Sequence, residues 1–403
     1  MQFVQKSFIL TLLIILFSGL LFSNKGYGEE NLVFSTHSSK QTVLKERKLP
    51  EDPPRFVFDS GFTFPYPDAI RGVYVTGHSA GGEKFNKLST LMEQTDLNAM
   101  VIDVKDDYGN LTYQPEPTSA FFDISKNYIK NPTEMLEIME EKEIYPIARV
   151  VVFKDSVLAN KKPEWSFKEG NTVWKNGRGE SFVNPFMKEV WDYNVDIAIE
   201  AAKLGFQEIQ FDYVRFPEGF EKRDSTLVFN MGQYENSDQD NVQKRVSAIT
   251  DFVAYAKEKL KPYGVKVSVD IFGYTATLPE APGIGQNFSK ISENVDVISS
   301  MIYPSHWTAY FGINKPDLEP YKLITEYAKL ENKKLAELKN RPISRPWIQD
   351  FTASYLGKGN YKKYGKPEVE AQIKALNEQG IDEFLLWNAG NTYSPGVDYT
   401  PLK

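Results

Sequence analysis

The sequence predicts a single-domain (β/α)8 barrel (TIM barrel), because short β-prone segments alternate with helical segments along most of the chain. The chain has 403 residues, of which 41% are hydrophobic and 25% are charged. A chain of this length can bury the core of one barrel of about 250 to 400 residues. A third observation is that several apolar runs end in polar residues. The carboxyl ends of the strands are the place at which a barrel presents its functional side chains.

The eight predicted strands are short runs rich in β-branched and aromatic residues. They span residues 72–76, 99–104, 145–153, 208–215, 265–272, 297–303, 346–351 and 383–387. Alternation of such runs with helices predicts a parallel sheet, and eight units favour a closed barrel over an open sheet.

Seven segments between the strands have helical spacing of their apolar residues. They span residues 83–95, 133–142, 185–204, 241–260, 288–294, 320–338 and 367–379. Asn131-Pro132 and Asn184-Pro185 are typical helix starts. Gly205, Gly264 and Gly380 directly follow predicted helices, as expected for their ends.

The amino terminus has the pattern of a secretory signal peptide. Lys6 precedes an apolar run over residues 8–22, and Gly26-Tyr27-Gly28 then provides the small residues that a signal peptidase accepts. We therefore expect residues 1–28 to be a signal peptide and the protein to be secreted or associated with the cell envelope. The alternative is an uncleaved membrane anchor, since the apolar run is near the short limit for spanning a bilayer.

Residues 29–68 are polar and proline-rich, which predicts a linker that becomes an ordered lead-in near Phe56 and has no core of its own. The barrel is expected over residues 69–403. After signal removal we expect no stable membrane span. Loss of Lys6 and Lys25 with the signal leaves 45 basic against 54 acidic residues, a net charge of −9. This acidic balance argues against nucleic acid as a partner.

The residue types also limit the chemistry. The chain has no cysteine, so thiolate metal sites and cysteine nucleophiles are excluded. Its three histidines lack metal-ligand spacing, and the turn with Asp106 and Asp107 lacks the pattern of a calcium loop, which indicates a solvated acidic turn. We expect no metal and no cofactor.

The most informative segment is the fourth predicted strand, which ends in the sequence Phe-Asp-Tyr-Val-Arg-Phe-Pro over residues 211–217. It brings Asp212 and Arg215 to the carboxyl end of a buried strand. The fifth strand offers Asp270 at the neighbouring position. Two adjacent carboxyl groups suit glycoside hydrolysis, in which one carboxylic acid protonates the leaving oxygen and a carboxylate attacks or activates water.

We expect Asp212 to be the nucleophile or base and Asp270 its carboxylate partner, with Glu218 and Asp103 as rival acids. A nearby arginine would favour the ionised form of Asp212. The other residues expected to bind substrate lie at or after strand ends: Asp103, Lys105, Arg149, Arg215, Tyr303, His306, Trp307, Gln349, Trp387 and Asn388. Tryptophans at such positions suit the apolar faces of sugars, although core packing explains a single tryptophan equally well. The expected partner is an oligosaccharide or polysaccharide.

Two other functions are compatible with these residues. The segment Gly77-His78-Ser79-Ala80-Gly81 matches the nucleophile elbow of serine esterases, with Asp270 and His306 following in hydrolase order. Against this reading, too few strands precede the motif for an elbow. The stronger alternative is a carbohydrate-binding barrel that has the aromatic side chains of a sugar cleft but no competent acid.

Five motifs resemble a bacterial family of predicted glycoside hydrolases of unassigned substrate. They lie at residues 72–77, 102–109, 147–155, 209–217 and 269–274, and the resemblance extends over about residues 70–400. It implies a glycosidase-like barrel distantly similar to the α-amylase type, in which a strand-four aspartate is the nucleophile and Asp212 takes that position. The acid of that type is a glutamate on strand five, where this chain has Asp270.

Overall fold

The computed structural model describes residues 32–35, 41–44 and 57–400. The predicted signal peptide and most of the predicted linker lie outside these residues. Within the linker, β1 (Leu32–Ser35) and β2 (Gln41–Leu44) pair in antiparallel fashion. They belong to a unit of residues 1–55 that is separate from the unit of residues 56–403. Both strands carry β-prone residues, Leu-Val-Phe and Thr-Val-Leu, which explains the local pairing.

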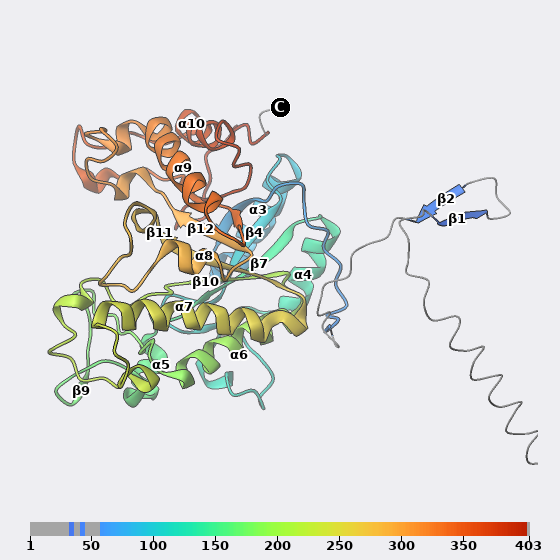
Figure 1. Ribbon diagram of the computed structural model, residues 1–403. Coiled ribbons are helices and arrows are strands. Elements are labelled where there is room, and N and C mark those ends of the chain that lie inside the picture. Colours follow the sequence, from blue (N-terminus) through green and yellow to red (C-terminus); the bar gives the residue numbers. More distant parts are fainter. Residues whose placement is uncertain (1–31, 36–40, 45–56, 401–403) are drawn as a thin grey trace, which may run out of the picture. The chain divides into compact units, whose positions relative to one another are not determined.

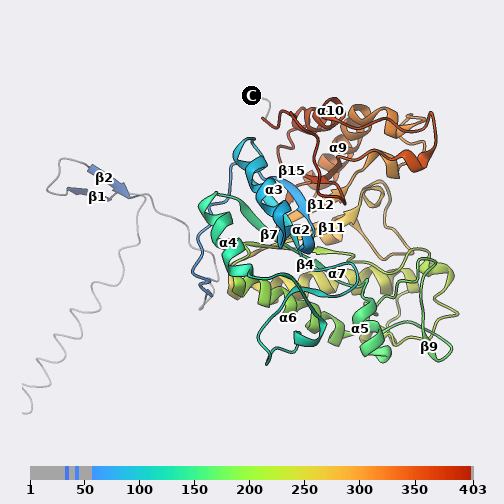
Figure 2. The same ribbon diagram turned by 180° about the vertical axis from the view of Figure 1, so that it is seen from behind.

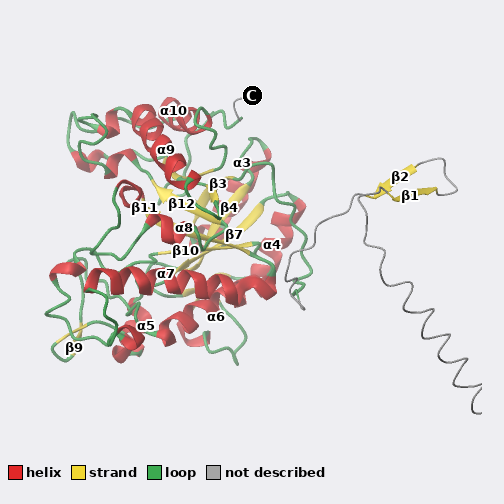
Figure 3. Cartoon of the chain, viewed as in Figure 1, coloured by secondary structure: helices red, strands yellow, loops and turns green. Residues whose placement is uncertain are grey.

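The second unit is a closed eight-stranded parallel barrel, which confirms the predicted fold. In order around the barrel its strands are β3 (Arg71–Val75), β4 (Ala99–Lys105), β7 (Tyr145–Val151), β10 (Glu208–Asp212), β11 (Lys266–Phe272), β12 (Val297–Met301), β14 (Trp347–Gln349) and β15 (Phe384–Trp387). Each strand pairs in parallel with the next, and β15 pairs with β3 to close the ring. Figure 3 shows these strands at the centre with helices around them.

Seven of the helices between strands match the seven predicted segments in order. They are α3 (Glu83–Glu93), α4 (Pro132–Glu141), α6 (Lys188–Leu204), α7 (Asn241–Leu260), α8 (Phe288–Ser292), α9 (Pro320–Ala336) and α10 (Lys366–Asn377). The two short helices α2 (Gly77–Ala80) and α5 (Ser156–Lys161) were not predicted. In both views α6 and α7 lie on one side of the strands and α9 and α10 on the opposite side (Figure 1 and Figure 2). None of the helices in the described residues has the length and apolarity needed to cross a bilayer.

Side-chain caps set several helix starts as the sequence predicted. Asn131 accepts a hydrogen bond from the Glu134 amide at the start of α4. The helix after Asn184 begins later than predicted, at Lys188, because the Asn184 side chain accepts from the Phe186 amide in a turn that precedes α6. Gly205, with φ of 122°, ends α6 in a conformation that favours glycine.

Short strands that the sequence did not predict decorate the barrel. They are β5 (Leu111–Tyr113) and β6 (Ser125–Ile129), which extend the sheet from β4, the small β8 (Lys168–Glu169) and β9 (Thr172–Val173) hairpin, and β13 (Ile343–Ser344) beside β12. Arg345 and Pro346 separate β13 from β14, and a proline has no amide proton to continue the ladder.

The fourth strand is shorter than predicted, and this places its functional residues differently. β10 ends at Asp212, because Tyr213 has a φ of 52°, in the left-handed region that interrupts a strand. Asp212 is therefore the last residue of the strand, whereas the prediction placed it three residues before the end. Arg215 lies in the following loop, which corrects its predicted position on the strand.

A buried ion cluster joins the amino ends of the strands to the lead-in segment. The Arg345 guanidinium donates to Glu208 at the start of β10 and to Glu383 just before β15, each at 2.7 Å. It also donates to the Tyr66 hydroxyl at 2.8 Å, and that hydroxyl donates to Glu383 at 2.8 Å. Tyr66 in the lead-in segment is thus bound to the barrel through this cluster.

Replacement of Arg345 by methionine should lower the free energy of unfolding by about 3 to 5 kcal/mol, because Glu208 and Glu383 would remain buried without their counter-charge. Urea denaturation of wild type and variant measures this difference. The control is Lys329→Met, which removes an exposed ion pair with Glu326 and should change stability by less than about 1 kcal/mol. Equal losses in the free energy of unfolding for the two variants would show that the buried cluster stabilises the protein no more than an exposed ion pair does.

Candidate active site

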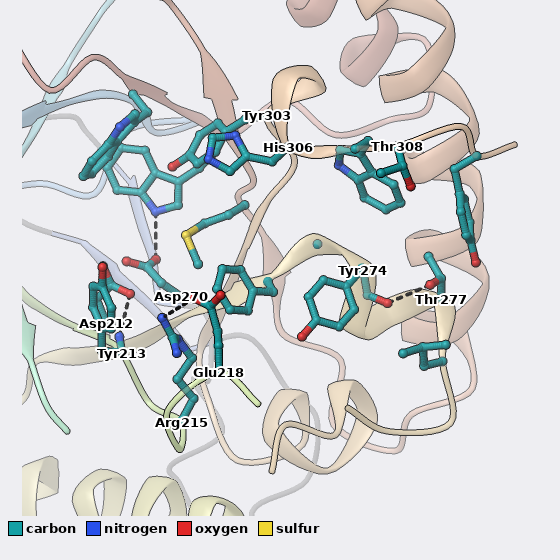
Figure 4. A pocket seen from close by; sticks show the side chains of 18 of the residues that line it. Asp212, Tyr213, Arg215, Glu218, Asp270, Tyr274, Thr277, Tyr303, His306 and Thr308 are labelled. Carbon is teal, nitrogen blue, oxygen red and sulfur yellow. Dashed lines mark hydrogen bonds and ion pairs between the residues drawn. The ribbon is translucent and has the colours of Figure 1, made fainter. Parts of the chain in front are cut away.

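A cavity of about 730 Å³ lies at the carboxyl ends of the barrel strands. This volume falls within the range of about 300 to 1,000 Å³ that is usual for small-ligand sites. Figure 4 shows Asp212 and Asp270 at one side of the cavity, with Tyr274, Thr277 and Thr308 at the other. Nine predicted site residues line it: Asp212, Asp270, Glu218, Arg149, Arg215, Tyr303, His306, Trp307 and Trp387.

Asp212 is held by two strands and one turn. Arg149 on β7 donates to Asp212 Oδ2 from Nη2 at 2.6 Å and from Nε at 3.0 Å. The amide of Tyr213 donates to Asp212 Oδ1 at 2.6 Å, so the left-handed turn after β10 also fixes the carboxylate. Arg149 and Asp212 are both buried, which strengthens their interaction relative to a surface pair. The orientation of Asp212 is therefore set before any ligand binds.

The same guanidinium binds two further carboxylates. Arg149 Nη1 lies 2.7 Å from Asp103 Oδ1, and Nη2 lies 2.8 Å from Asp107 Oδ1. Burial would raise the pKa of Asp107, but Arg149 and Lys154 outweigh it and lower that pKa to about 2. Asp107 is thus a partner of Arg149 at the cavity wall, which corrects its predicted place in a solvated turn.

Asp103 supports the site from behind. Burial raises the pKa of Asp103 to about 6 despite the charge of Arg149. Its second oxygen accepts a hydrogen bond from the Tyr74 hydroxyl at 2.6 Å. Asp103 is 4% exposed and is absent from the cavity lining, because Arg149 and Tyr74 cover both carboxylate oxygens. Its predicted role as a substrate ligand or rival acid is replaced by contact with Arg149.

Asp270 on β11 differs from Asp212 in its environment. Trp347 Nε1 donates to Asp270 Oδ1 at 2.8 Å. Burial, followed by the negative charge of Asp212, raises the pKa of Asp270 well above its usual range. Arg149 forms an ion pair with Asp212, whereas no cation among the described residues forms one with Asp270, and this difference favours the protonated form of Asp270.

Glu218 and Arg215 form the rim of the cavity. Arg215 Nη2 lies 3.3 Å from Glu218 Oε1, and the Glu218 side chain is 61% exposed. The Arg215 guanidinium also lies over the rings of Tyr213 and Phe272, each at 4.7 Å from the ring centroid. Arg215 therefore contacts the rim and not Asp212, which leaves Arg149 as the arginine that binds Asp212.

Lys105 does not reach the cavity, contrary to its predicted role in substrate binding. It is fully buried, and its ammonium lies 2.6 Å from Asp155 Oδ2. It also donates to the backbone oxygen of Val151 and to Asn194 Oδ1, each at 2.8 Å. Asp103 and Lys105 are two residues apart on β4, a spacing at which side chains normally point to the same face of a sheet. The register of β4 with β7 shifts between them, so Lys105 does not share the direction of Asp103 toward Arg149.

Two further predicted ligands also lie outside the cavity lining. Gln349 is fully buried, donates to Asp317 at 3.0 Å and accepts from the Ser305 amide at 3.0 Å. Asn388 donates to the backbone oxygen of Asp350 at 2.6 Å. Their polar groups hold the loops after β12, β14 and β15, so both predictions of substrate contact are wrong.

The cavity also contains residues that sequence reasoning missed. They are Arg178, Tyr213, Tyr274, Thr277, Leu278, Met301, Thr308 and Tyr310, together with two small or apolar positions at the end of β11, Phe272 and Gly273. Arg178 comes from the long segment after β7, where its sequence has no motif that separates it from other surface arginines. Tyr274 does lie in a predicted strand-end motif and could have been selected on that ground.

The nucleophile-elbow alternative is not supported by the contacts of Ser79. Ser79 accepts a hydrogen bond from Thr76 Oγ1 at 3.1 Å within the first turn of α2. The ring of His78 packs on Tyr128 at 3.7 Å, and His306 Nδ1 lies 3.1 Å from Ser305 Oγ. Neither His78 nor Ser79 lines the cavity. Within the described residues, no group of three or more metal-ligating side chains is arranged around a common point.

Replacement of Asp270 by asparagine should change how stability depends on pH. In wild type the folded state keeps the Asp270 proton above pH 4 while the unfolded state releases it, so stability falls as pH rises. The Asp270→Asn variant cannot release this proton, so its free energy of unfolding does not fall in this way. The difference in free energy of unfolding, variant minus wild type, should therefore rise by up to about 1.4 kcal/mol per pH unit above pH 4. Urea denaturation from pH 4 to pH 8 measures the difference. A constant difference across this range would contradict the raised pKa.

Comparison with one solved structure agrees with the fold, and two further matches have lower structural similarity. The glycoside hydrolase domain of PgaB (BpsB) from Bordetella bronchiseptica is 13% identical, with a TM-score of 0.57, over 80% of this chain and 95% of that chain. A hypothetical protein from Ruminiclostridium thermocellum is 34% identical over 49% of this chain and 96% of its own, with a TM-score of 0.42. An alpha-amylase from Lactobacillus plantarum is 13% identical over 80% and 71%, with a TM-score of 0.48.

No curated protein matches this chain. Residues 72–393 match the family described as "Putative glycosyl hydrolase domain". The match includes every barrel strand from β4 to β15 and all the cavity residues described above, and it confirms the resemblance seen in the sequence motifs. The chain therefore belongs to this glycosyl hydrolase family.

Proposed function

We propose that this protein hydrolyses glycosidic bonds of a cell-wall, capsular or environmental polysaccharide by a two-carboxylate mechanism. The observation that carries the proposal is the unequal pair Asp212 and Asp270, at the ends of the adjacent strands β10 and β11 and in the cavity of about 730 Å³. One carboxylate has an arginine counter-charge, whereas the other is buried and favours its proton. Glycoside hydrolysis needs one ionised and one protonated carboxyl group.

In this mechanism Asp212 acts as the nucleophile or base. Arg149 and the Tyr213 amide orient its carboxylate for attack at the anomeric carbon or for activation of water. Asp270 protonates the leaving oxygen, because burial and the charge of Asp212 raise its pKa and favour its protonated form. Trp347 fixes the Asp270 carboxyl group through its indole N–H.

Glu218 is the second candidate for the general acid. It lies on the cavity rim, exposed and paired with Arg215, and the loop after β10 could bring it over a bound glycan. Asp270 is favoured because it lies beside Asp212 in the buried part of the cavity. A carbohydrate-binding barrel without catalysis remains the alternative function, and its supporting observation is the aromatic lining of the same cavity.

Activity on a panel of neutral and acidic polysaccharides, read as new reducing ends, tests the proposal. Asp212→Asn and Asp270→Asn should each lower kcat/KM by about 10² to 10⁴. The control Glu326→Gln, on the exposed face of α9, should leave activity unchanged. Wild-type activity should fall as pH rises through the raised pKa of Asp270, because the acid then loses its proton, and Asp270→Asn should lose this limb of the profile.

Each other result of the panel has a defined meaning. Full activity in Asp212→Asn would overturn the proposed nucleophile or base. The fall of activity at alkaline pH could be lost in Glu218→Gln and retained in Asp270→Asn. This result would identify Glu218 as the general acid. Binding of glycans without any cleavage by wild type would favour the carbohydrate-binding barrel.

We also propose that the protein is exported and that residues 1–28 are removed. The support is the basic start, apolar run and small-residue end of this segment. Amino-terminal sequencing of the protein recovered from the medium or cell envelope should give a first residue at Glu29. A mature protein that still begins at Met1 and sediments with membranes would instead identify the segment as an anchor.

A further inference from the structure

The half of the cavity away from Asp212 and Asp270 is built by the loops that follow β11 and β12. Its lining consists of Tyr274, Thr277, Leu278, Trp307, Thr308 and Tyr310. Figure 4 shows Tyr274, Thr277 and Thr308 together on this side. We call these six residues the aromatic half. None of them carries a formal charge, whereas all seven charged lining residues belong to the remainder of the cavity.

Aromatic rings are exposed in this half although the core is close by. Tyr274 and Tyr310 are each 39% exposed, and Trp307 is partly buried. An exposed ring leaves apolar area in contact with water, which is unfavourable in free energy. A flat ligand that covers the ring removes part of this area from water. The rings therefore offer surface for a ligand with an apolar face.

The position of Trp307 is fixed before a ligand binds. Its ring packs on Phe311 and on Tyr327, each at 5.8 Å between ring centroids. Gly273 brings the two loops together, because a Cβ at this position would lie 2.6 Å from the Met301 carbonyl oxygen and 3.2 Å from the Trp307 ring. Only glycine permits this contact without displacement. A surface that is ordered in advance loses less entropy on binding.

The polar side-chain groups of the aromatic half are the hydroxyl groups of its threonines and tyrosines and the indole N–H of Trp307. Thr277 and Thr308 contribute one hydroxyl each, and Thr277 Oγ1 donates to the backbone oxygen of Tyr274 at 2.7 Å. Two cations lie near this half. The Arg215 guanidinium is already paired with Glu218 Oε1 at 3.3 Å, and the Lys334 ammonium on α9 donates to the Leu278 carbonyl at 2.8 Å and does not line the cavity. A carboxylate bound here would lose water without gaining an unpaired cation.

We propose that the aromatic half is a binding subsite for an uncharged pyranose unit of the substrate glycan. Its rings cover the apolar face of the sugar, and its hydroxyl groups meet the sugar hydroxyls. That this unit lies next to the one cleaved between Asp212 and Asp270 rests on the proposed function, whereas the binding itself does not. The protein therefore recognises a chain of at least two sugars, and it selects a neutral unit over a uronic acid at this subsite.

Calorimetric titration of the Asp212→Asn protein with hexasaccharides tests the subsite. The neutral probes are cellohexaose, maltohexaose and chitohexaose, and the acidic probe is hexagalacturonate. At least one neutral probe should bind, and it should bind at least tenfold more tightly than the acidic probe. Addition of Tyr274→Ala or Tyr310→Ala should weaken this binding about tenfold, the effect of losing one stacked ring.

Tyr321→Ala in the same background is the matched control. Tyr321 is also 39% exposed but lies on α9, where it hydrogen-bonds to Glu378, so its loss should leave binding unchanged. The subsite is refuted if no neutral probe binds, if hexagalacturonate binds equally well, or if the Tyr274 and Tyr310 variants bind as tightly as the control. Tyrosine-dependent binding of a neutral probe by a wild-type protein that hydrolyses no glycan would refute the proposed catalysis and support the subsite.

Discussion

The candidate active site depends on the ion pair between Arg149 and Asp212. One buried guanidinium holds Asp103, Asp107 and Asp212 at distances of 2.6 to 2.8 Å, so strands β4, β7 and β10 share a single cation. A planar guanidinium can serve several carboxylates at once, which a lysine ammonium does less well. Because this cation lies with Asp212, the neighbouring Asp270 is left without one, and burial then decides its protonation. The difference between the two aspartates follows from one arginine.

The fold could be predicted almost completely, since it depends on signals that are local in the sequence. Each of the eight strands is a short segment rich in β-branched or aromatic residues, and caps such as Asn131 act within three residues. Strand ends were less accurate, because they depend on backbone conformations that a sequence does not reveal. Tyr213 ends β10 through a left-handed φ that is uncommon for a tyrosine, and this change moved Arg215 from the strand to the cavity rim.

The site was predicted in part, and the errors share a physical cause. Position at a strand end brings a residue near the cavity, but the direction of its side chain depends on the strand register. Lys105 illustrates this, because an irregularity in the pairing of β4 with β7 separates it from Asp103 and directs it to Asp155. Arg178 illustrates the opposite error, since a turn after β9 in the long segment between β7 and α6 supplies it and no spacing along the chain connects it with the barrel ends.

The two halves of the cavity have complementary chemistry. In the half with Asp212 and Asp270, burial favours the protonated form of Asp270, so exclusion of water suits this half. The cavity is nevertheless open to solvent on the side of Tyr274 and Tyr310. A sugar held on those exposed rings would cover this opening and displace water from around the aspartates. On the proposed mechanism, binding energy gained at a remote unit would thus strengthen the electrostatic interactions at the reacting bond. The aromatic half would then contribute to catalysis as well as to affinity, although none of its residues reaches the reacting atoms.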